Sequence, residues 1–164
     1  YKQYQIRIKP KFGYLQELAP ALQWLNSYTE KESVVLGSPD YTSEIVPIYT
    51  HNNIYVCYHS QFYALPPLQE IRDRLYNMMY FMGVTSQEES KKFARKLMLP
   101  EGLFFEEYQE KLKKDLYSEL KKYRADYLLY GPLERKYFRV DPGKTYSFLK
   151  KVYDDGAVNI YQII

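Results

Sequence analysis

The sequence is poor in the residue types that most metal and cofactor sites require. Its 164 residues include one cysteine and two histidines. Cys57 has no partner for an intramolecular disulfide, and inside a predicted strand it is expected to be a buried, unreactive thiol. His51 and His59 do not complete a metal-ligand set with that cysteine. The sequence therefore predicts neither a metal site nor a bound cofactor.

Glycine-rich phosphate loops are also missing. Gly37 stands alone in its segment, and the chain contains no G-x-G-x-x-G motif. Gly143-Lys144-Thr145 does not complete a G-x-x-x-x-G-K-[ST] motif, because Phe138 stands where that motif has its first glycine. These are the two patterns whose backbone amides cradle phosphates. No candidate nucleophile is accompanied by an evident base. We therefore expect that this chain is not catalytic by itself.

Long apolar runs and one-sided charge are absent as well. No run approaches the roughly 18–20 apolar residues of a membrane span, and no signal peptide is visible. The net charge is +3, and acidic and basic residues are mixed along the predicted helices, which argues against a nucleic-acid-binding face.

The length suffices for one domain with its own core. Because the chain opens at Tyr1 in mid-pattern, we expect residues 1–164 to be a single domain cut from a larger protein.

Tyrosine, by contrast, is abundant: there are 20 tyrosines, 8 phenylalanines and 1 tryptophan. A tyrosine offers a flat apolar ring and a hydroxyl, which suits half-buried sheet surfaces, membrane interfaces and sugar-stacking platforms. Packing within the fold is the first interpretation. Tyr108, Tyr117 and Tyr123, on a charged helix, either rim the core or face a membrane or a partner.

Residues 33–60 predict a strand–helix–strand unit. Residues 34–36 and 54–58 are continuous runs of apolar residues, each followed by a polar turn. Such runs are typical of parallel strands that are buried on both faces. Between them, Asp40 or Thr42 caps a short helix. That helix is expected to pack on the sheet through Ile45, Val46, Ile48 and Tyr49.

Two later strands complete the predicted sheet. Residues 125–131 form a third apolar run after a long helical insertion at about 66–123. The turn residues 154–156 predict a hairpin that ends in a strand over residues 158–163. We predict an α/β fold, a small and mostly parallel Rossmann-like sheet with helices on both faces, a helical insertion and a C-terminal β-hairpin.

The N-terminal segment predicts a strand followed by a helix. Residues 4–9 alternate between apolar and polar side chains, which is typical of a half-buried or edge strand, here closed by Pro10. Residues 15–28 have apolar side chains at helical spacing, and Pro20 is expected to mark the first turn of the main helical part.

The insertion is expected to contain three helices. The first opens after Pro67. The second starts at a capping box of Ser86 and Glu89, whose side chains satisfy each other's backbone amides. The third is predicted as one amphipathic helix over residues 105–123, with its lysines facing solvent.

Polar side chains follow each of the three predicted parallel strands. Asp40 and Tyr41 follow the first strand, His59 the second, and Glu134 and Arg135 the third. In parallel sheets, ligands bind beyond the carboxyl ends of the strands, so these five residues are the candidate ligand-binding site, suited to a sugar or phosphate group. A structural alternative stays open, in which Asp40 caps a helix, His59 bonds a backbone carbonyl and Glu134 pairs with Arg135 or a lysine.

Four segments together carry a family resemblance: 24–39 (WLNSYTEKESVVLGSP), 42–59 (TSEIVPIYTHNNIYVCYH), 125–136 (ADYLLYGPLERK) and 152–164 (VYDDGAVNIYQII). They resemble the soluble carboxy-terminal domain of polytopic bacterial membrane glycosyltransferases of the GT-C type and their uncharacterised relatives. The similar features are a Trp-Leu helix, a strand ending in a small-residue–Pro turn, a Thr-x-x-hydrophobic-Pro-x-Tyr segment, a Tyr-Gly-Pro-x-Glu-Arg turn and a final Asp-Gly hairpin.

Two positions depart from the family pattern. Tyr58-His59 stands where a Gly-His pair is often expected. Residues 37–41 read Gly-Ser-Pro-Asp-Tyr where oligosaccharyltransferases carry Trp-Trp-Asp-Tyr-Gly. The second departure argues against recognition of an Asn-glycosylation sequon by this domain.

The resemblance implies a domain on the extracytoplasmic side of the cell membrane, in a membrane-embedded parent. It would assist a glycosyltransferase in binding a lipid-linked sugar or a glycan acceptor, while the transferring carboxylates lie between transmembrane helices, outside this chain. The basic residues Lys2, Arg7, Lys9 and Lys11 point the other way, because positive flanks favour the cytoplasmic side. The alternative is a non-catalytic protein-interaction domain of an uncharacterised membrane protein, which docks a partner through its tyrosine-rich helices.

Overall fold

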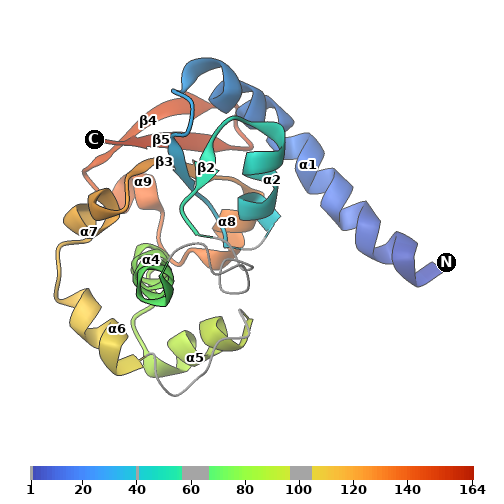
Figure 1. The fold of residues 1–164 in the computed structure, drawn as a ribbon. Coiled ribbons are helices and arrows are strands. Elements are labelled where there is room, and N and C mark those ends of the chain that lie inside the picture. The colour runs from blue at the N-terminus through green and yellow to red at the C-terminus, as the bar shows by residue number, and fades with distance from the viewer. Residues whose placement is uncertain (1, 40, 57–66, 97–104) are drawn as a thin grey trace.

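The computed structural model describes residues 2–39, 41–56, 67–96 and 105–164. A five-stranded sheet with the strand order β2-β1-β3-β5-β4 lies at the centre of these residues (Figure 1). The strands are β1 (Val34–Leu36), β2 (Asn53–Ile54), β3 (Ala125–Tyr130), β4 (Leu149–Asp154) and β5 (Asn159–Ile163). The fold is therefore mixed α/β, as predicted.

The first half of the sheet is parallel. β1 pairs in parallel with β2 on one side and with β3 on the other. Val35 and Leu36 are both buried but belong to different apolar clusters, as expected for a strand covered on both faces. β2 is shorter than the predicted strand 54–58, and its pairing continues through one bond from the Tyr55 N–H to the Val35 carbonyl, at 2.9 Å. Cys57 lies outside the described residues.

The second half of the sheet is antiparallel. The predicted hairpin is confirmed, with β4 antiparallel to β5 and Gly156 in the left-handed region at φ +86°. β5 also pairs antiparallel with β3. The prediction of a mostly parallel, Rossmann-like sheet is not confirmed, because the hairpin lies directly against β3 and two of the four strand pairs are antiparallel.

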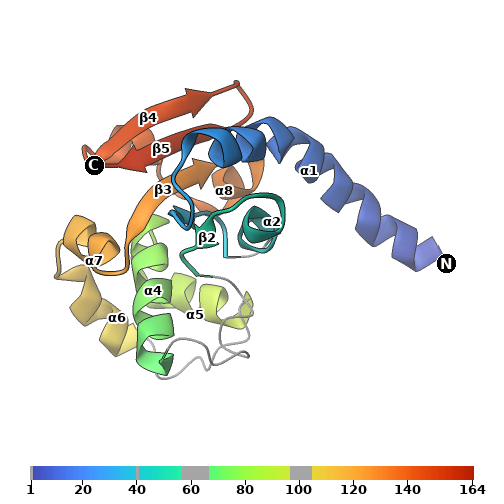
Figure 2. The same ribbon diagram turned by 45° about the horizontal axis from the view of Figure 1, so that its top comes forward.

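Helices cover both faces of the sheet. α1 (Lys2–Tyr28) and α2 (Tyr41–Tyr49) share one apolar cluster with Val35 and Leu129. On the other face, four helices share a second cluster with Leu36 and Leu128. These are α4 (Leu68–Phe81), α5 (Gln87–Lys96), α6 (Phe105–Leu112) and α7 (Leu116–Lys122), which Figure 2 shows together on one side, away from α1. The short α8 (Pro132–Tyr137) follows β3, and α9 (Pro142–Thr145) precedes β4.

The N-terminal half of α1 projects away from the rest of the molecule (Figures 1 and 2). The predicted strand at residues 4–9 is wrong, since α1 is one helix that passes through Pro10 and Pro20. A projecting segment has no neighbouring strand, so a helix is the structure that satisfies its backbone hydrogen bonds internally. At 1.5 Å per residue, α1 is about 40 Å long. Among the described residues, no helix combines the length and apolar character required to cross a membrane.

The helical insertion follows its capping signals. The Glu89 N–H donates to the Ser86 hydroxyl at 3.3 Å, and the Glu89 carboxylate accepts from the Thr85 N–H at 3.0 Å, one residue earlier than predicted. The predicted continuous helix over 105–123 is wrong. Asp115 accepts a hydrogen bond from the Ser118 N–H at 2.8 Å and so caps a new helix, α7, after α6 has ended.

Two surface expectations are corrected. Ile45 and Val46 of α2 are buried as predicted, but Ile48 and Tyr49 are 70% and 51% exposed. α2 neighbours β2, whose two residues offer little sheet surface to cover the end of the helix. Tyr108, a candidate for partner docking, is fully buried and donates its hydroxyl to the Val84 carbonyl.

Candidate functional site

The structure describes three of the five predicted site residues. Asp40 and His59 lie outside the described residues. Tyr41 is half-buried at the start of α2, and burial, then the nearby Tyr49 and Glu44, raise the pKa of its hydroxyl. Glu134 and Arg135 lie in α8, directly after β3.

Glu134 links the two loops that follow β1 and β3. Its side chain is 0% exposed. One carboxylate oxygen accepts from the Ser38 N–H at 2.7 Å, and the other accepts from the Gly131 N–H at 2.9 Å. The carboxylate therefore holds the carboxyl ends of the two strands together. It makes these bonds to backbone groups, whereas the structural alternative expected a partner among Arg135 and the lysines.

The space around this carboxylate is filled. A Cβ atom built on Gly37 would lie 2.6 Å from the Thr42 Cγ2 atom and 3.6 Å from the Glu134 Oε1 atom. A Cβ atom built on Gly131 would lie 3.3 Å from the Glu134 Oε2 atom. A side chain in place of Gly37 would therefore force Thr42 to move, and one in place of Gly131 would press on Glu134 and on the Leu18 Cδ2 atom, 3.1 Å away.

Arg135 points away from Glu134. Its guanidinium donates to the Ala157 carbonyl at 2.7 Å and lies over the Tyr130 ring, 5.6 Å from the ring centroid. Both partners belong to the fold. The structure therefore brings together the loops that follow β1 and β3, but the Glu134 side chain bonds to the backbone of those loops and the Arg135 side chain bonds to the turn before β5.

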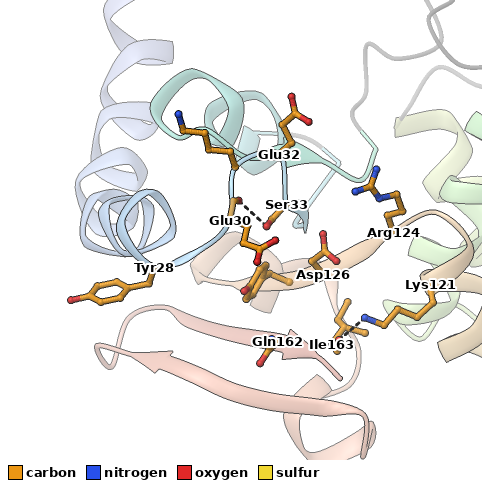
Figure 3. A pocket seen from close by; sticks show the side chains of 11 residues that line it. Tyr28, Glu30, Glu32, Ser33, Lys121, Arg124, Asp126, Gln162 and Ile163 are labelled. Atoms are coloured by element: carbon orange, nitrogen blue, oxygen red, sulfur yellow. Dashed lines mark hydrogen bonds between the residues drawn. The ribbon is translucent and has the colours of Figure 1, made fainter.

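A polar pocket lies at the opposite edge of the sheet, at the amino ends of β1 and β3 (Figure 3). Its volume is about 440 Å³. β1 and β3 are parallel, and β5 is antiparallel to β3, so the amino ends of the first two strands meet the carboxyl end of the third. The lining residues are Tyr28, Glu30, Lys31, Glu32, Ser33, Lys121, Arg124, Asp126, Tyr127, Gln162 and Ile163.

Several lining groups are fixed by bonds within the fold. The Asp126 carboxylate accepts from the Val34 N–H at 2.8 Å. The Lys121 ammonium donates to the Ile163 carbonyl at 2.7 Å, and the Ser33 hydroxyl donates to the Glu30 carbonyl at 2.8 Å. These bonds fix the side chains of three lining residues, so the lining of the pocket is partly pre-organised.

The phenol of Tyr127 stays protonated in this setting. Burial raises the pKa of its hydroxyl first, and the negative charges of Asp126 and Glu30 raise it further. Tyr127 is therefore available as a hydrogen-bond donor across the physiological pH range.

Charged groups of both signs remain available to a ligand. Lys31 and Arg124 are exposed, and in the part of the chain that the structure describes neither side chain has a hydrogen bond or an ion pair. Glu30 and Glu32 are exposed on the same loop as Lys31. The pocket thus offers cationic donors and anionic acceptors side by side.

An aromatic group forms one end of the pocket. Tyr28 is 72% exposed and stacks on Trp24, with ring centroids 5.6 Å apart. Trp24 in turn contacts Tyr153 at 5.7 Å and Tyr127 at 6.5 Å, so the exposed ring rests on a supported aromatic base. Figure 3 shows Tyr28 at one end of the pocket, with its ring directed outward, and Lys121 and Arg124 at the other end.

The backbone is unusual at two lining residues. Glu32 and Arg124 have positive φ values, +64° and +59°, and they are the two non-glycine residues of this kind among those described. Such conformations cost free energy for residues with a side chain and cluster at functional sites. Both side chains line the same pocket.

The pocket chemistry suits polar organic ligands. Within the described ranges, no group of three or more histidine, cysteine, aspartate or glutamate side chains is arranged to hold a metal ion. Carboxylates, an amide, a phenol and two free cations fit the hydroxyl groups of a polyol or sugar. Comparison of the chain with family models, with curated proteins and with solved structures finds no match.

The sequence pattern predicted a site at the carboxyl ends of the strands, whereas this pocket lies at their amino ends. Charged residues lie within 29–32 and within 121–124, and the lysines of the helix predicted over residues 105–123 were expected to face solvent. A usable signal was present, however. Both charged segments directly precede strands that were predicted to be parallel, and the amino ends of parallel neighbours lie at one edge.

Proposed function

We propose that this chain is a non-catalytic saccharide-binding domain that assists a membrane-bound, glycosyltransferase-like protein on the extracytoplasmic side of the cell membrane. Its ligand would be a sugar, in the form of a lipid-linked sugar or a glycan acceptor. The observation that supports binding is the polar pocket of about 440 Å³ with an exposed tyrosine at its rim.

The pocket combines the two contacts that sugars make with proteins. Sugar hydroxyls pair with carboxylates, amides and cationic donors, which Glu30, Gln162 and Lys31 supply here. The apolar face of a sugar ring packs on an aromatic ring, which Tyr28 offers. The volume falls within the range of roughly 300–1,000 Å³ for small-molecule sites.

The membrane context is supported by the sequence resemblance of residues 24–59 and 125–164. In that reading the domain holds a sugar or acceptor, and the reacting carboxylates belong to the membrane part. The pocket contains no arrangement of nucleophile and base that would give the domain a reaction of its own.

Saturation-transfer NMR with the isolated chain tests binding directly. Neutral and charged oligosaccharides and sugar phosphates are the probes, and we expect saturation transfer to at least one class. Tyr28→Ala should abolish transfer to the ring protons of the sugar, and it should leave the fold intact because this side chain is largely exposed. Tyr49→Ala is the matched control, because Tyr49 is also exposed but lies outside the pocket lining. Silence of the wild type towards all probes would refute the proposal.

The alternative function, protein interaction, is favoured by the exposed apolar residues Pro47, Ile48 and Tyr49 at the end of α2. Of the three tyrosines that first suggested it, Tyr108 is buried, and Tyr117 and Tyr123 are half-buried. Ile48→Asp distinguishes the two functions. Loss of the parent's activity with Ile48→Asp but not with Tyr28→Ala favours interaction, and the reverse favours saccharide binding.

A further inference from the structure

Arg124 occupies a position where glycine fits best. It directly follows the last turn of α7 and its N–H donates to the Lys121 carbonyl at 2.9 Å, with φ at +59°. Helices often end in this left-handed conformation, and glycine is preferred there because a Cβ atom strains it. Arginine at this position therefore weakens the fold relative to glycine.

The Arg124 side chain makes no polar contact with the described residues that would compensate for this backbone strain. It is exposed, and among the described residues its guanidinium has neither a hydrogen bond nor an ion pair. Figure 3 shows it at one end of the pocket, on the same side as Lys121. The Lys121 ammonium donates one hydrogen bond to the Ile163 carbonyl at 2.7 Å, and its other N–H groups remain as possible donors to a ligand. This end of the pocket thus presents two cations.

Carboxylates share the pocket with these two cations. Glu30 and Glu32 belong to the loop before β1, and Figure 3 shows Glu30 between Tyr28 and Arg124, and Glu32 at the top of the view. Asp126 lies between the two ends, and one of its oxygens already accepts from the Val34 N–H. A ligand with one anionic group and several hydroxyls matches this distribution, with the anion at Arg124 and the hydroxyls towards the glutamates.

We propose that the pocket selects saccharides that carry an oxyanion, with Arg124 as the specificity-determining residue. The guanidinium fork binds a carboxylate or a phosphate through two parallel hydrogen bonds. The inference rests on the proposed saccharide-binding function and narrows its ligand class. An acidic sugar and a sugar phosphate share this chemistry.

Isothermal titration at low salt with three probes tests the selectivity. The probes are cellobiose, digalacturonate and glucose 1-phosphate. We expect wild-type protein to bind at least one anionic probe about tenfold or more tightly than cellobiose, the difference typical of a charge-assisted contact. Digalacturonate alone or glucose 1-phosphate alone above that threshold supports the proposal and identifies the source of the anion.

Arg124→Gly gives a two-sided readout. It should remove the preference for the anionic probe and also raise the melting temperature by roughly 2–4 °C, because the strain at the end of α7 is relieved. Glu32→Gly is the control for the thermal effect, since it relieves the same kind of backbone strain, and it should raise the melting temperature. Tyr49→Ala, which lies outside the pocket lining, should keep the preference for the anionic probe. Arg124→Lys, which keeps the charge without the fork, should retain part of the preference.

The outcomes separate the two levels of the proposal. Equal affinity for cellobiose and both anionic probes, or an undiminished preference in Arg124→Gly, overturns the role of Arg124 while saccharide binding stands. Inorganic phosphate that binds as tightly as glucose 1-phosphate also overturns it, because the sugar would then contribute nothing. If none of the three probes, nor any other saccharide, binds the wild type, both proposals fail.

Discussion

Replacing Glu134 by glutamine removes a buried charge while keeping the shape of the side chain almost unchanged. The wild-type carboxylate accepts two backbone hydrogen bonds, at 2.7 Å from Ser38 and at 2.9 Å from Gly131. A hydrogen bond to a charged acceptor contributes about 1.5–3 kcal/mol. Glutamine keeps one acceptor oxygen, which forms a neutral bond worth about 0.5–1.5 kcal/mol.

The second backbone amide then faces the NH₂ group of the glutamine. Two donors oppose each other, so one buried N–H is left unsatisfied, at a cost of about 1–3 kcal/mol. Glutamine is neutral, so the variant also avoids the free-energy cost of burying a charge, which offsets part of the lost stability. We expect Glu134→Gln to lower the free energy of unfolding by about 2–4 kcal/mol, or roughly 5–15 °C in melting temperature for a domain of this size.

Urea unfolding followed by circular dichroism at pH 7 measures this change. Glu17→Gln is the control, because Glu17 is exposed on α1 and its replacement should stay within about 0.5 kcal/mol. A Glu134→Gln protein as stable as the wild type, or more stable, would refute the reasoning. The carboxylate would then be a charge that the fold tolerates, and a ligand at the carboxyl ends of β1 and β3 would become the better explanation for it.

Two further predictions concern acid stability and packing. Burial opposes the ionisation of Asp73, but the hydrogen bond from Tyr123 at 2.6 Å and the charge of Lys111 outweigh it and lower the pKa of the carboxyl below 3.8. The ionised Asp73 carboxylate therefore stabilises the fold above about pH 4, and this contribution is lost as pH falls through the lowered pKa. Asp73→Asn should be less stable than the wild type by about 1–2 kcal/mol at pH 7. In urea titrations the difference in free energy of unfolding between the two proteins should close below pH 4, and a difference that stays constant with pH would contradict this. Gly37→Ala should cost about 1–3 kcal/mol through the 2.6 Å approach to Thr42, whereas Gly13→Ala, in α1 with nothing within 4 Å of the added methyl, should gain about 0.5–1 kcal/mol in thermal unfolding.

The strands and caps of this fold could be predicted because local chemistry decides them. Residues 34–36 are apolar throughout, and residues 125–130 are apolar apart from Asp126, a pattern that fits a strand covered by helices on either side. The turn at 154–156 and the cap at Ser86 use side-chain hydrogen bonds that act within a few residues. Such signals need no knowledge of the remote chain.

The errors arose where a remote neighbour decides the outcome. Residues 4–9 alternate like a strand, but no strand is available to pair with them, and α1 continues instead. The sequence 105–123 has one apolar stripe, yet the Asp115 cap divides it into two helices. In both cases periodicity was a weaker signal than the hydrogen bonds available to the backbone.

The candidate site shows the same limit. The ends of β1 and β3 were correctly expected to converge, but whether their polar residues serve a ligand or the fold depends on a contact across 96 residues, from Glu134 to Ser38. The left-handed backbone at Glu32 and Arg124 has no sequence signal at all, because glycine or asparagine would normally mark it. The pocket at the amino ends therefore became visible only in three dimensions.

The two outer strands of the sheet bear on how this domain behaves at high concentration. β2 presents two residues, and β4 carries the exposed Lys150 and Lys151 along its length. Short strands and lysines on open edges discourage a strand of another molecule from adding to the sheet. Growth of the sheet from chain to chain is thus opposed at both ends, and any association of this domain has to use its side-chain surfaces instead.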